Sequence, residues 1–146
     1  MILTANICFN TSIIYGDNNA FLRKALWSDI VSRNDGWEST PWILMGDFNA
    51  IRNQSERLGE STTWTGHMDR LETCIREAKV DDLRYSGMHY TWTNQCSENL
   101  IMRKLDRVLV NEKWNMTFPL SEARLFRSYS VLYLARTERK DLCRCV

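Results

Sequence analysis

The sequence has no excess of charge of either sign, no long apolar run and no regular pattern of cysteines. Its formal net charge is +1, so the chain as a whole is not a basic clamp for nucleic acid. No run approaches the roughly 18 apolar residues of a membrane span, and no basic segment followed by an apolar stretch opens the chain. We therefore expect an intracellular protein, nuclear or cytoplasmic, that has no membrane partner.

The 5 cysteines fit neither a disulfide framework nor a zinc site with four ligands, because they are odd in number and mostly scattered. Two of them, Cys143 and Cys145, lie in the terminal sequence Cys-Arg-Cys. A reducing compartment fits this usage best. The sequence also offers no sign of a protein partner.

The chain does have the composition of one globular domain. Its 146 residues are enough for one core but not for two, and 44% hydrophobic residues argue against disorder. Charge is unevenly distributed: residues 1–100 carry 9 basic and 13 acidic side chains, whereas residues 101–146 carry 10 basic and 5 acidic ones. The basic C-terminal third fits contact with phosphates, and it fits an ordinary solvated surface equally well.

Hydrophobic spacing predicts an α/β chain with a mixed sheet. Apolar residues at helical spacing predict helices at about residues 19–33, ended by the segment 33–36, and from Met68 to Ala78. An apolar run without alternation predicts a strand buried on both faces at residues 42–45. The remaining expected elements are strands at residues 7–9 and 12–15 separated by a turn at 10–11, strands at 80–83, 90–93, 100–110 and 130–134, and a short helix at 111–118.

The end of the strand at residues 42–45 carries the sharpest polar feature, the sequence Gly46-Asp47-Phe48-Asn49. If the chain stays extended, Asp47 and Asn49 point to the same side, at the edge where α/β sheets bind ligands. A carboxylate there binds a cation or orients water, and a carboxamide donates to a phosphoryl oxygen. Asp and Asn after a strand are also common turn formers, and the residue types alone favour that simpler interpretation.

Several segments, in order, resemble the endonuclease/exonuclease/phosphatase superfamily. They are Ile14-Tyr15-Gly16 with Arg23–Trp27, then Trp42–Ala50 with its GDFN motif, then Asp82–Asn94, and finally Met102–Asn111. The sequences of these segments are most similar to the endonuclease domain of plant LINE-type (non-LTR) retrotransposons. The resemblance spans about residues 7 to 123, and the combination of ordered segments is much more specific than any one of them.

The resemblance implies an α/β fold with a two-layer β-sandwich flanked by helices, in the four-layer arrangement of DNase-like proteins. It also implies that the domain is incomplete at its N- and C-terminal ends. The family's first strands bring an Asn and a metal-binding Glu that have no counterpart here, and its Ser-Asp-His segment is replaced by Arg127-Ser128-Tyr129-Ser130-Val131. We expect residues 1–127 to form the partial domain and residues 128–146 to be a divergent tail.

The resemblance further implies residue roles in the hydrolysis of a phosphodiester. Asp47 would orient and help deprotonate the attacking water, and Asn49 would hold the scissile phosphate. Asp106 would be a carboxylate that either contacts the metal or supports the residues around it, Tyr15 would lie near the phosphate, and Thr91 would flank the bound substrate. The implied cofactor is Mg²⁺ or Mn²⁺, with Asp47 and Asp106 as ligands, and the implied partner is DNA.

Each of these residues also has a simpler interpretation. Tyr15 fits a core aromatic, Thr91 a β-branched strand residue, and Asp106 a surface ion pair with Arg103 or Arg107. The two histidines, His67 and His89, are expected on the surface or in packing.

The sequence therefore predicts a catalytically incomplete fragment of a metal-dependent DNA endonuclease domain of retrotransposon origin. The alternatives are a non-catalytic module that binds nucleic acid or another partner, and a reading frame without function. If the first interpretation holds, Asp47, Asn49, Thr91 and Asp106 should converge on one cleft, with Tyr15 on its wall.

Overall fold

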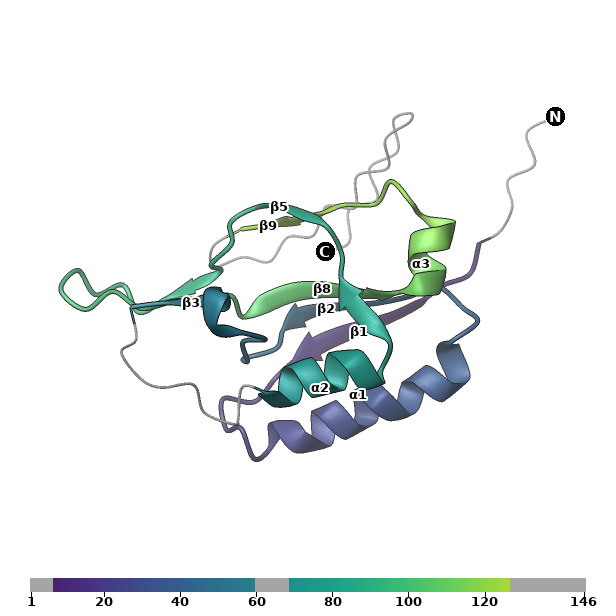
Figure 1. The fold of residues 1–146 in the computed structure, drawn as a ribbon, viewed down its shortest axis with the longest axis horizontal. Coiled ribbons are helices and arrows are strands. Elements are labelled where there is room, and N and C mark those ends of the chain that lie inside the picture. The colour runs from purple at the N-terminus through teal and green to yellow at the C-terminus, as the bar shows by residue number, and fades with distance from the viewer. Residues whose placement is uncertain (1–6, 60–68, 127–146) are drawn as a thin grey trace.

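A mixed sheet forms the centre of the structure, with its four strands in the spatial order β1-β2-β8-β4 (Figure 1). The computed structural model describes residues 7–59 and 69–126. The strands are β1 (Asn10–Tyr15), β2 (Trp42–Asp47), β4 (Val80–Asp82) and β8 (Asp106–Asn111). β1 and β2 are parallel, whereas β8 is antiparallel to both β2 and β4. Because a parallel pair needs a long crossover, a helix connects β1 to β2.

Helices α1 (Arg23–Trp37) and α2 (Asp69–Glu77) cover one face of this sheet (Figure 1). One apolar cluster joins the helices to the sheet, and its buried side chains include Trp27, Ile30, Trp42, Leu44, Leu71, Ile75 and Leu109. Burial of one Leu or Ile side chain stabilises a fold by roughly 1.5–3 kcal/mol. This cluster therefore holds both helices on the sheet.

The opposite face packs against a second layer that contains β5 (Tyr85–Gly87), β9 (Ala123–Leu125) and α3 (Glu112–Thr117). β5 and β9 form a parallel two-stranded sheet. Side chains alternate along a strand, so Ile43 packs in this second layer while its neighbour Leu44 packs against the helices. The central strands are thus buried on both faces.

A third, smaller sheet has the order β3-β7-β6 and lies beyond one end of the central sheet (Figure 1). Its strands are β3 (Arg57–Leu58), β6 (Trp92–Thr93) and β7 (Met102–Arg103), and a 3-10 turn at Gln54–Glu56 leads into β3. Within residues 7–59 and 69–126, none of the helices combines the length and the apolar character that a membrane span requires.

The predicted α/β class is confirmed, and the strand predicted at residues 42–45 is indeed buried on both faces and extends to Asp47. The helix predicted at residues 19–33 corresponds to α1, which begins at Arg23 and ends at Trp37. The prediction that residues 33–36 end it is wrong, because α1 continues through Gly36 to Trp37, whose ring packs edge-on against Trp42 at 5.2 Å. That contact offsets the cost of about 1 kcal/mol of a glycine within a helix.

The turn predicted at residues 10–11 is also wrong. Asn10 and Thr11 lie within β1, where Asn10 N donates to Pro41 O at 2.8 Å and each residue has a partner in β2. Pairing with β2 therefore outweighs the local preference of these two residues for a turn. The predicted strand at residues 130–134 lies outside the described residues, so the division near residue 127 stays a prediction, as does the four-layer arrangement.

Candidate active site

Two carboxylates lie side by side at one end of the central sheet. Asp47 is the last residue of β2 and Asp106 is the first residue of β8, and the two are register partners in the antiparallel β2–β8 pair. Partners in such a pair point to the same face of the sheet, with Cβ atoms about 4.5–5.5 Å apart. The register alone therefore brings the two acids together.

Both carboxylates line a polar pocket of about 350 Å³. The other lining residues are Thr91, Trp92, Thr93, Gln95 and Leu105. A larger groove of about 630 Å³ lies between α1 and α2, but among the described residues Glu77 is the one carboxylate that lines it. The smaller pocket is the better candidate site, because it holds two acids on a fixed strand pair.

Thr91 fixes the approach of β8 to this pocket. Its buried hydroxyl oxygen accepts hydrogen bonds from the backbone N–H groups of Leu105, at 3.1 Å, and Asp106, at 3.0 Å. The two bonds occupy both lone pairs of the oxygen, so the hydroxyl keeps only its O–H for donation. Thr91 thus does more than fill a β-branched strand position, and it precedes β6 rather than lying within it.

Asn49 lies beside Asp47 in a different way from the one predicted. The strand ends at Asp47, and Asn49 adopts a positive φ of 48°, so the condition for Asp47 and Asn49 to point to the same side, an extended chain, is not met. Its backbone N–H donates to Asp47 Oδ1 at 2.8 Å, and its Nδ2 donates to Gly16 O at 2.9 Å. Asn49 therefore forms the turn that holds the Asp47 carboxylate, and it does not line the pocket.

Tyr15 is the register partner of Asp47 on the other side, in β1. Its side chain is 79% exposed, so the interpretation as a core aromatic is wrong. Tyr15 lies on the edge strand next to the site and does not line the pocket either. The structure thus brings together Asp47, Thr91 and Asp106, with Asn49 and Tyr15 at the margins, and the roles of all five residues stay predictions.

A comparison with protein families identifies the family of this chain. A model of the endonuclease/exonuclease/phosphatase family matches residues 5–122, which is most of the chain. The chain belongs to the endonuclease/exonuclease/phosphatase family. Members of this family are generally metal-dependent phosphoesterases or nucleases.

Other comparisons add little to this family assignment. A solved structure of beta toxin from Staphylococcus aureus is similar over 72% of this chain, with 15% identity and a TM-score of 0.41. The chain spans 36% of the length of that structure. No curated protein matches this member of the endonuclease/exonuclease/phosphatase family significantly.

The donor set suits the divalent cation that the endonuclease/exonuclease/phosphatase family uses, provided a substrate phosphate shares it. Mg²⁺ is commonly bound by one or two carboxylates together with waters and phosphate oxygens, and Asp47 and Asp106 supply two carboxylates on neighbouring strands. Among the described residues there is no group of three or more His, Cys, Asp and Glu side chains that could form a closed cage. The pocket therefore fits a cation held jointly by protein and substrate.

Burial raises the pKa of Asp47 above its ordinary value, and the nearby charge of Asp106 raises it further. The hydrogen bond from the Asn49 backbone and the charge of Arg23 act in the opposite direction. Two facing carboxylates repel each other when both are ionised. A bound cation would relieve that repulsion.

We expect Asp47→Asn to stabilise the metal-free protein at pH 7. A raised pKa means that the folded state holds a proton which the unfolded state has already lost, so the wild-type protein loses stability as pH rises through the folded-state pKa. The carboxamide of the variant carries no charge and would avoid this loss, and it would keep an oxygen for the Asn49 N–H. Urea unfolding in EDTA should show the advantage at pH 7 and its disappearance below about pH 4, the ordinary range of Asp.

Glu38 is a suitable comparison, because its pKa is shifted in the opposite direction from that of Asp47. A hydrogen bond and an ion pair with Lys79 lower the pKa of Glu38. Glu38→Gln should therefore lose a little stability at pH 7, and the loss should vanish at low pH. An Asp47→Asn variant that is less stable than the wild type at pH 7 would contradict the environment described for Asp47.

Of the residues that line the pocket, sequence reasoning missed Trp92, Thr93, Gln95 and Leu105. Trp92 is 41% exposed, and the guanidinium of Arg103 lies 5.8 Å from its ring centroid. The signal available for Trp92 and Thr93 was their adjacency to Thr91 in the alternating segment Tyr90-Thr91-Trp92-Thr93. Of the histidines, His89 hydrogen-bonds Tyr85 and Ser55 and does not line the pocket, and His67 lies outside the described residues.

Proposed function

We propose that this chain carries part of the active site of a divalent-metal phosphodiesterase that cleaves DNA, and that it derives from a LINE-type retrotransposon endonuclease. The observation that supports this most is the register of Asp47 with Asp106, next to the Thr91 hydroxyl. Turn chemistry at residues 46–49 would not require a second carboxylate in the same pocket. A metal-dependent phosphodiesterase makes use of one, because carboxylates hold the cation beside the phosphate on which the oriented donors and charges act.

In this proposal each residue acts through its observed geometry. The Asp47 carboxylate orients the attacking water and accepts its proton, while Asn49 keeps that carboxylate in place. The Thr91 O–H, which has no acceptor capacity left, donates to a phosphoryl oxygen. A divalent cation bound by Asp47 and Asp106 would supply neutralisation of phosphate charge.

We also propose that the chain by itself is catalytically incomplete. Only two carboxylates and no histidine line the pocket among the described residues. Residues that act as a unit fail together when one is missing. The isolated chain is therefore expected to bind the cation and a phosphate without hydrolysing the substrate.

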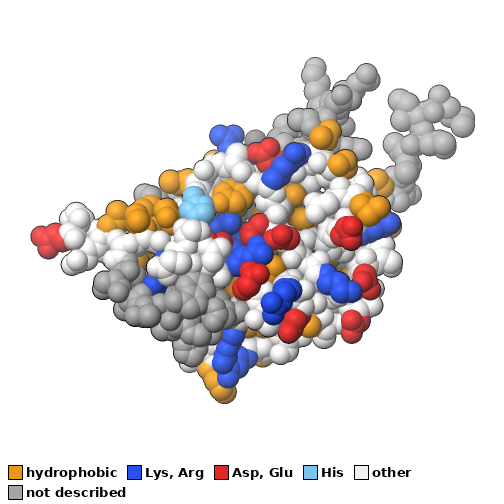
Figure 2. All heavy atoms as spheres, viewed as in Figure 1, with side chains coloured by type: hydrophobic (Ala, Val, Ile, Leu, Met, Phe, Trp, Pro, Cys, Tyr) orange, Lys and Arg blue, Asp and Glu red, His pale blue; other side chains and the backbone are white. Residues whose placement is uncertain are grey.

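The alternative function, a non-catalytic module that binds nucleic acid, was based in part on the basic charge of the C-terminal third. Two cations of the basic C-terminal third, Lys104 and Arg107, are buried in ion pairs rather than available to phosphates. Figure 2 shows acidic and basic side chains interspersed over one face of the molecule, without a large patch of one sign. Such a surface does not favour a broad electrostatic contact with a DNA backbone.

The proposal can be tested by Mn²⁺ binding, followed by electron paramagnetic resonance in the presence of a phosphorothioate oligonucleotide that resists cleavage. Asp47→Asn and Asp106→Asn should each weaken Mn²⁺ binding about tenfold or more. Asp35→Asn, at an exposed carboxylate of α1, is the matched control and should bind like the wild type. Equal binding by all four proteins would rule out the site.

Nicking of supercoiled plasmid tests the second part of the proposal. The chain alone should not nick with Mg²⁺ or Mn²⁺. Nicking that disappears in Asp47→Ala would support the site and overturn the proposed incompleteness. Nicking that persists in Asp47→Ala would identify a contaminating nuclease.

A further inference from the structure

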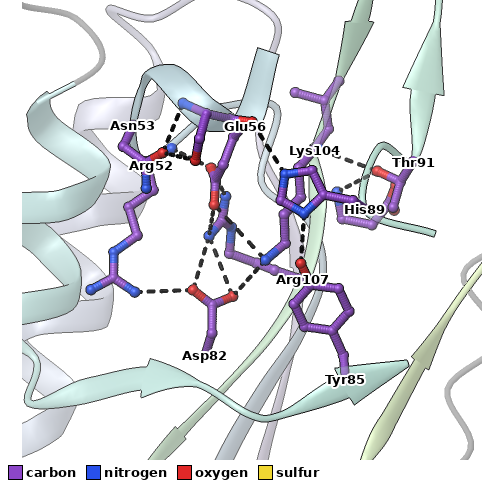
Figure 3. Close-up of polar contacts among 12 residues, drawn as sticks. Arg52, Asn53, Glu56, Asp82, Tyr85, His89, Thr91, Lys104 and Arg107 are labelled. Carbon is purple, nitrogen blue, oxygen red and sulfur yellow. Dashed lines mark hydrogen bonds and ion pairs between the residues drawn. The ribbon is translucent and has the colours of Figure 1, made fainter. Parts of the chain in front are cut away.

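A cluster of charged side chains, most of them buried, surrounds Arg107, the residue that follows Asp106 in β8 (Figure 3). The charged cluster consists of Arg52, Glu56, Asp82, Lys104 and Arg107. Arg107 donates to both carboxylate oxygens of Glu56, at 3.2 and 2.6 Å, and its Nη1 lies 3.3 Å from Asp82 Oδ2. Lys104 Nζ donates to Asp82 Oδ1 at 3.2 Å, and Arg52 Nη1 to Asp82 Oδ2 at 3.0 Å.

The central members of the charged cluster are almost completely withdrawn from solvent. Arg107 is 1% exposed, Lys104 3% and Glu56 4%. Although burial disfavours its charge, Arg107 and Lys104 hold the pKa of Asp82 below the usual range. Taking such ions out of water is so costly that well-packed apolar residues are often as stable or more so. Stability alone therefore gives no sufficient reason for these charges.

The position of the charged cluster supplies a second reason, because it fixes the segment that leads into β8. Glu56 O accepts from Lys104 N at 2.9 Å, and Glu56 Oε2 accepts from Arg52 N at 2.6 Å. Glu56 thus connects the loop that follows Asn49 to the bend between β7 and β8. On the other side of that bend, Thr91 holds the N–H groups of Leu105 and Asp106.

Arg107 and Asp106 are neighbours whose side chains point to opposite faces of β8. Anchoring the Arg107 guanidinium in a two-pronged pair with Glu56 therefore fixes the rotation of the strand at Asp106. A bidentate Arg–carboxylate pair is well suited to this, because it sets direction as well as distance. Supporting contacts of this kind are what keep a site within about 0.5 Å of its productive geometry.

We infer that Glu56 is a positioning residue, which acts through Arg107 and Lys104 to hold Asp106 beside Asp47. Its relevance to catalysis rests on the proposed function, but the positioning itself can be measured without metal or substrate. Glu56 is not among the residues that line the pocket, so it acts from the opposite side of the strand.

The test uses Glu56→Gln in the full chain, with two readouts. The first is amide hydrogen exchange at Leu105 and Asp106, measured by NMR relative to amides in the middle of the β2–β8 pair. We expect the substitution to raise the exchange rates of Leu105 and Asp106 about tenfold more than it raises the rates of the reference amides, because the bend opens locally. The second is Mn²⁺ affinity with the phosphorothioate oligonucleotide, expected to fall about tenfold.

Leu125→Ala is the control for a merely structural effect, because Leu125 is buried in the second layer and does not line the pocket. It should lower overall stability without selective exchange at Leu105 and Asp106. Should Glu56→Gln fail to fold, the double variant Glu56→Gln/Lys104→Met removes one anion together with one cation. It should fold and show the same selective exchange, since Arg107 still lacks its two-pronged partner.

The outcomes separate this inference from the proposed function. Selective exchange in a protein whose wild type binds no Mn²⁺ would support the positioning role and sink the proposed function. Unchanged relative exchange in a folded Glu56→Gln or double variant would overturn the inference, whatever the wild type binds. Selective exchange with weaker Mn²⁺ binding would support both.

Discussion

Replacing Gly46 by alanine is expected to destabilise the fold by about 2–5 kcal/mol. Gly46 has a φ of 139°, which side chains with a Cβ rarely adopt, and an added Cβ would lie 2.1 Å from Ile14 O. That oxygen belongs to the backbone of β1, so relief requires the parallel β1–β2 pair to shift. Because Asp47 follows directly, the same shift should also weaken Mn²⁺ binding. Urea unfolding followed by tryptophan fluorescence measures the first effect.

Gly36→Ala is the matched control for Gly46→Ala. Gly36 lies within α1, and an added Cβ there would meet no atom within 4 Å. Alanine is favoured over glycine in a helix by about 0.5–1 kcal/mol, so this variant should be more stable than the wild type. If the two alanine variants changed stability equally, the close approach of β1 to Gly46 would be refuted.

Trp42→Ala is expected to cost about 3–5 kcal/mol, which is a large part of the roughly 5–15 kcal/mol typical of a domain. Trp42 is fully buried, its ring packs against Trp37, and its indole N–H donates to Ser12 Oγ at 3.1 Å. The substitution leaves a cavity between the sheet and α1 and an unpaired hydroxyl. Circular dichroism at 25 °C should show a substantial unfolded fraction and a much lower urea midpoint.

Trp92→Ala compares the same residue type at the rim of the pocket. Since Trp92 is substantially exposed, its loss should change stability by less than about 1 kcal/mol. A similar cost for both tryptophans would mean that Trp42 does not occupy the centre of the core.

The candidate site shows where sequence reasoning stops. Asp47 could be found from the sequence, because an unbroken apolar run ends in Gly-Asp-Phe-Asn and such a run predicts a buried strand. Asp106 could be found only through the family resemblance. Nothing local marks it, since its partner Asp47 lies 59 positions away, and cross-strand register depends on how the whole sheet assembles.

Two local predictions were wrong at positions that long-range contacts decide. Asn10 and Thr11 have turn-forming residue types, but pairing with β2 makes them strand. Gly36 is a poor helix residue, but packing of Trp37 on Trp42 carries the helix past it. In both cases the free energy of tertiary contacts exceeds a local preference of about 1 kcal/mol.

The sequence by itself determined the α/β class, the buried strand at residues 42–45 and the family to which the chain belongs, because periodicity and ordered motifs are local properties. Only the tertiary structure decided that Asp47 faces Asp106, that Asn49 turns back to hold its neighbour, and that Arg107 is paired with Glu56 on the opposite side of β8. These arrangements depend on strand register and on the direction of side chains across a sheet. Neither is encoded in any short stretch of residues, since both arise when distant segments pack together.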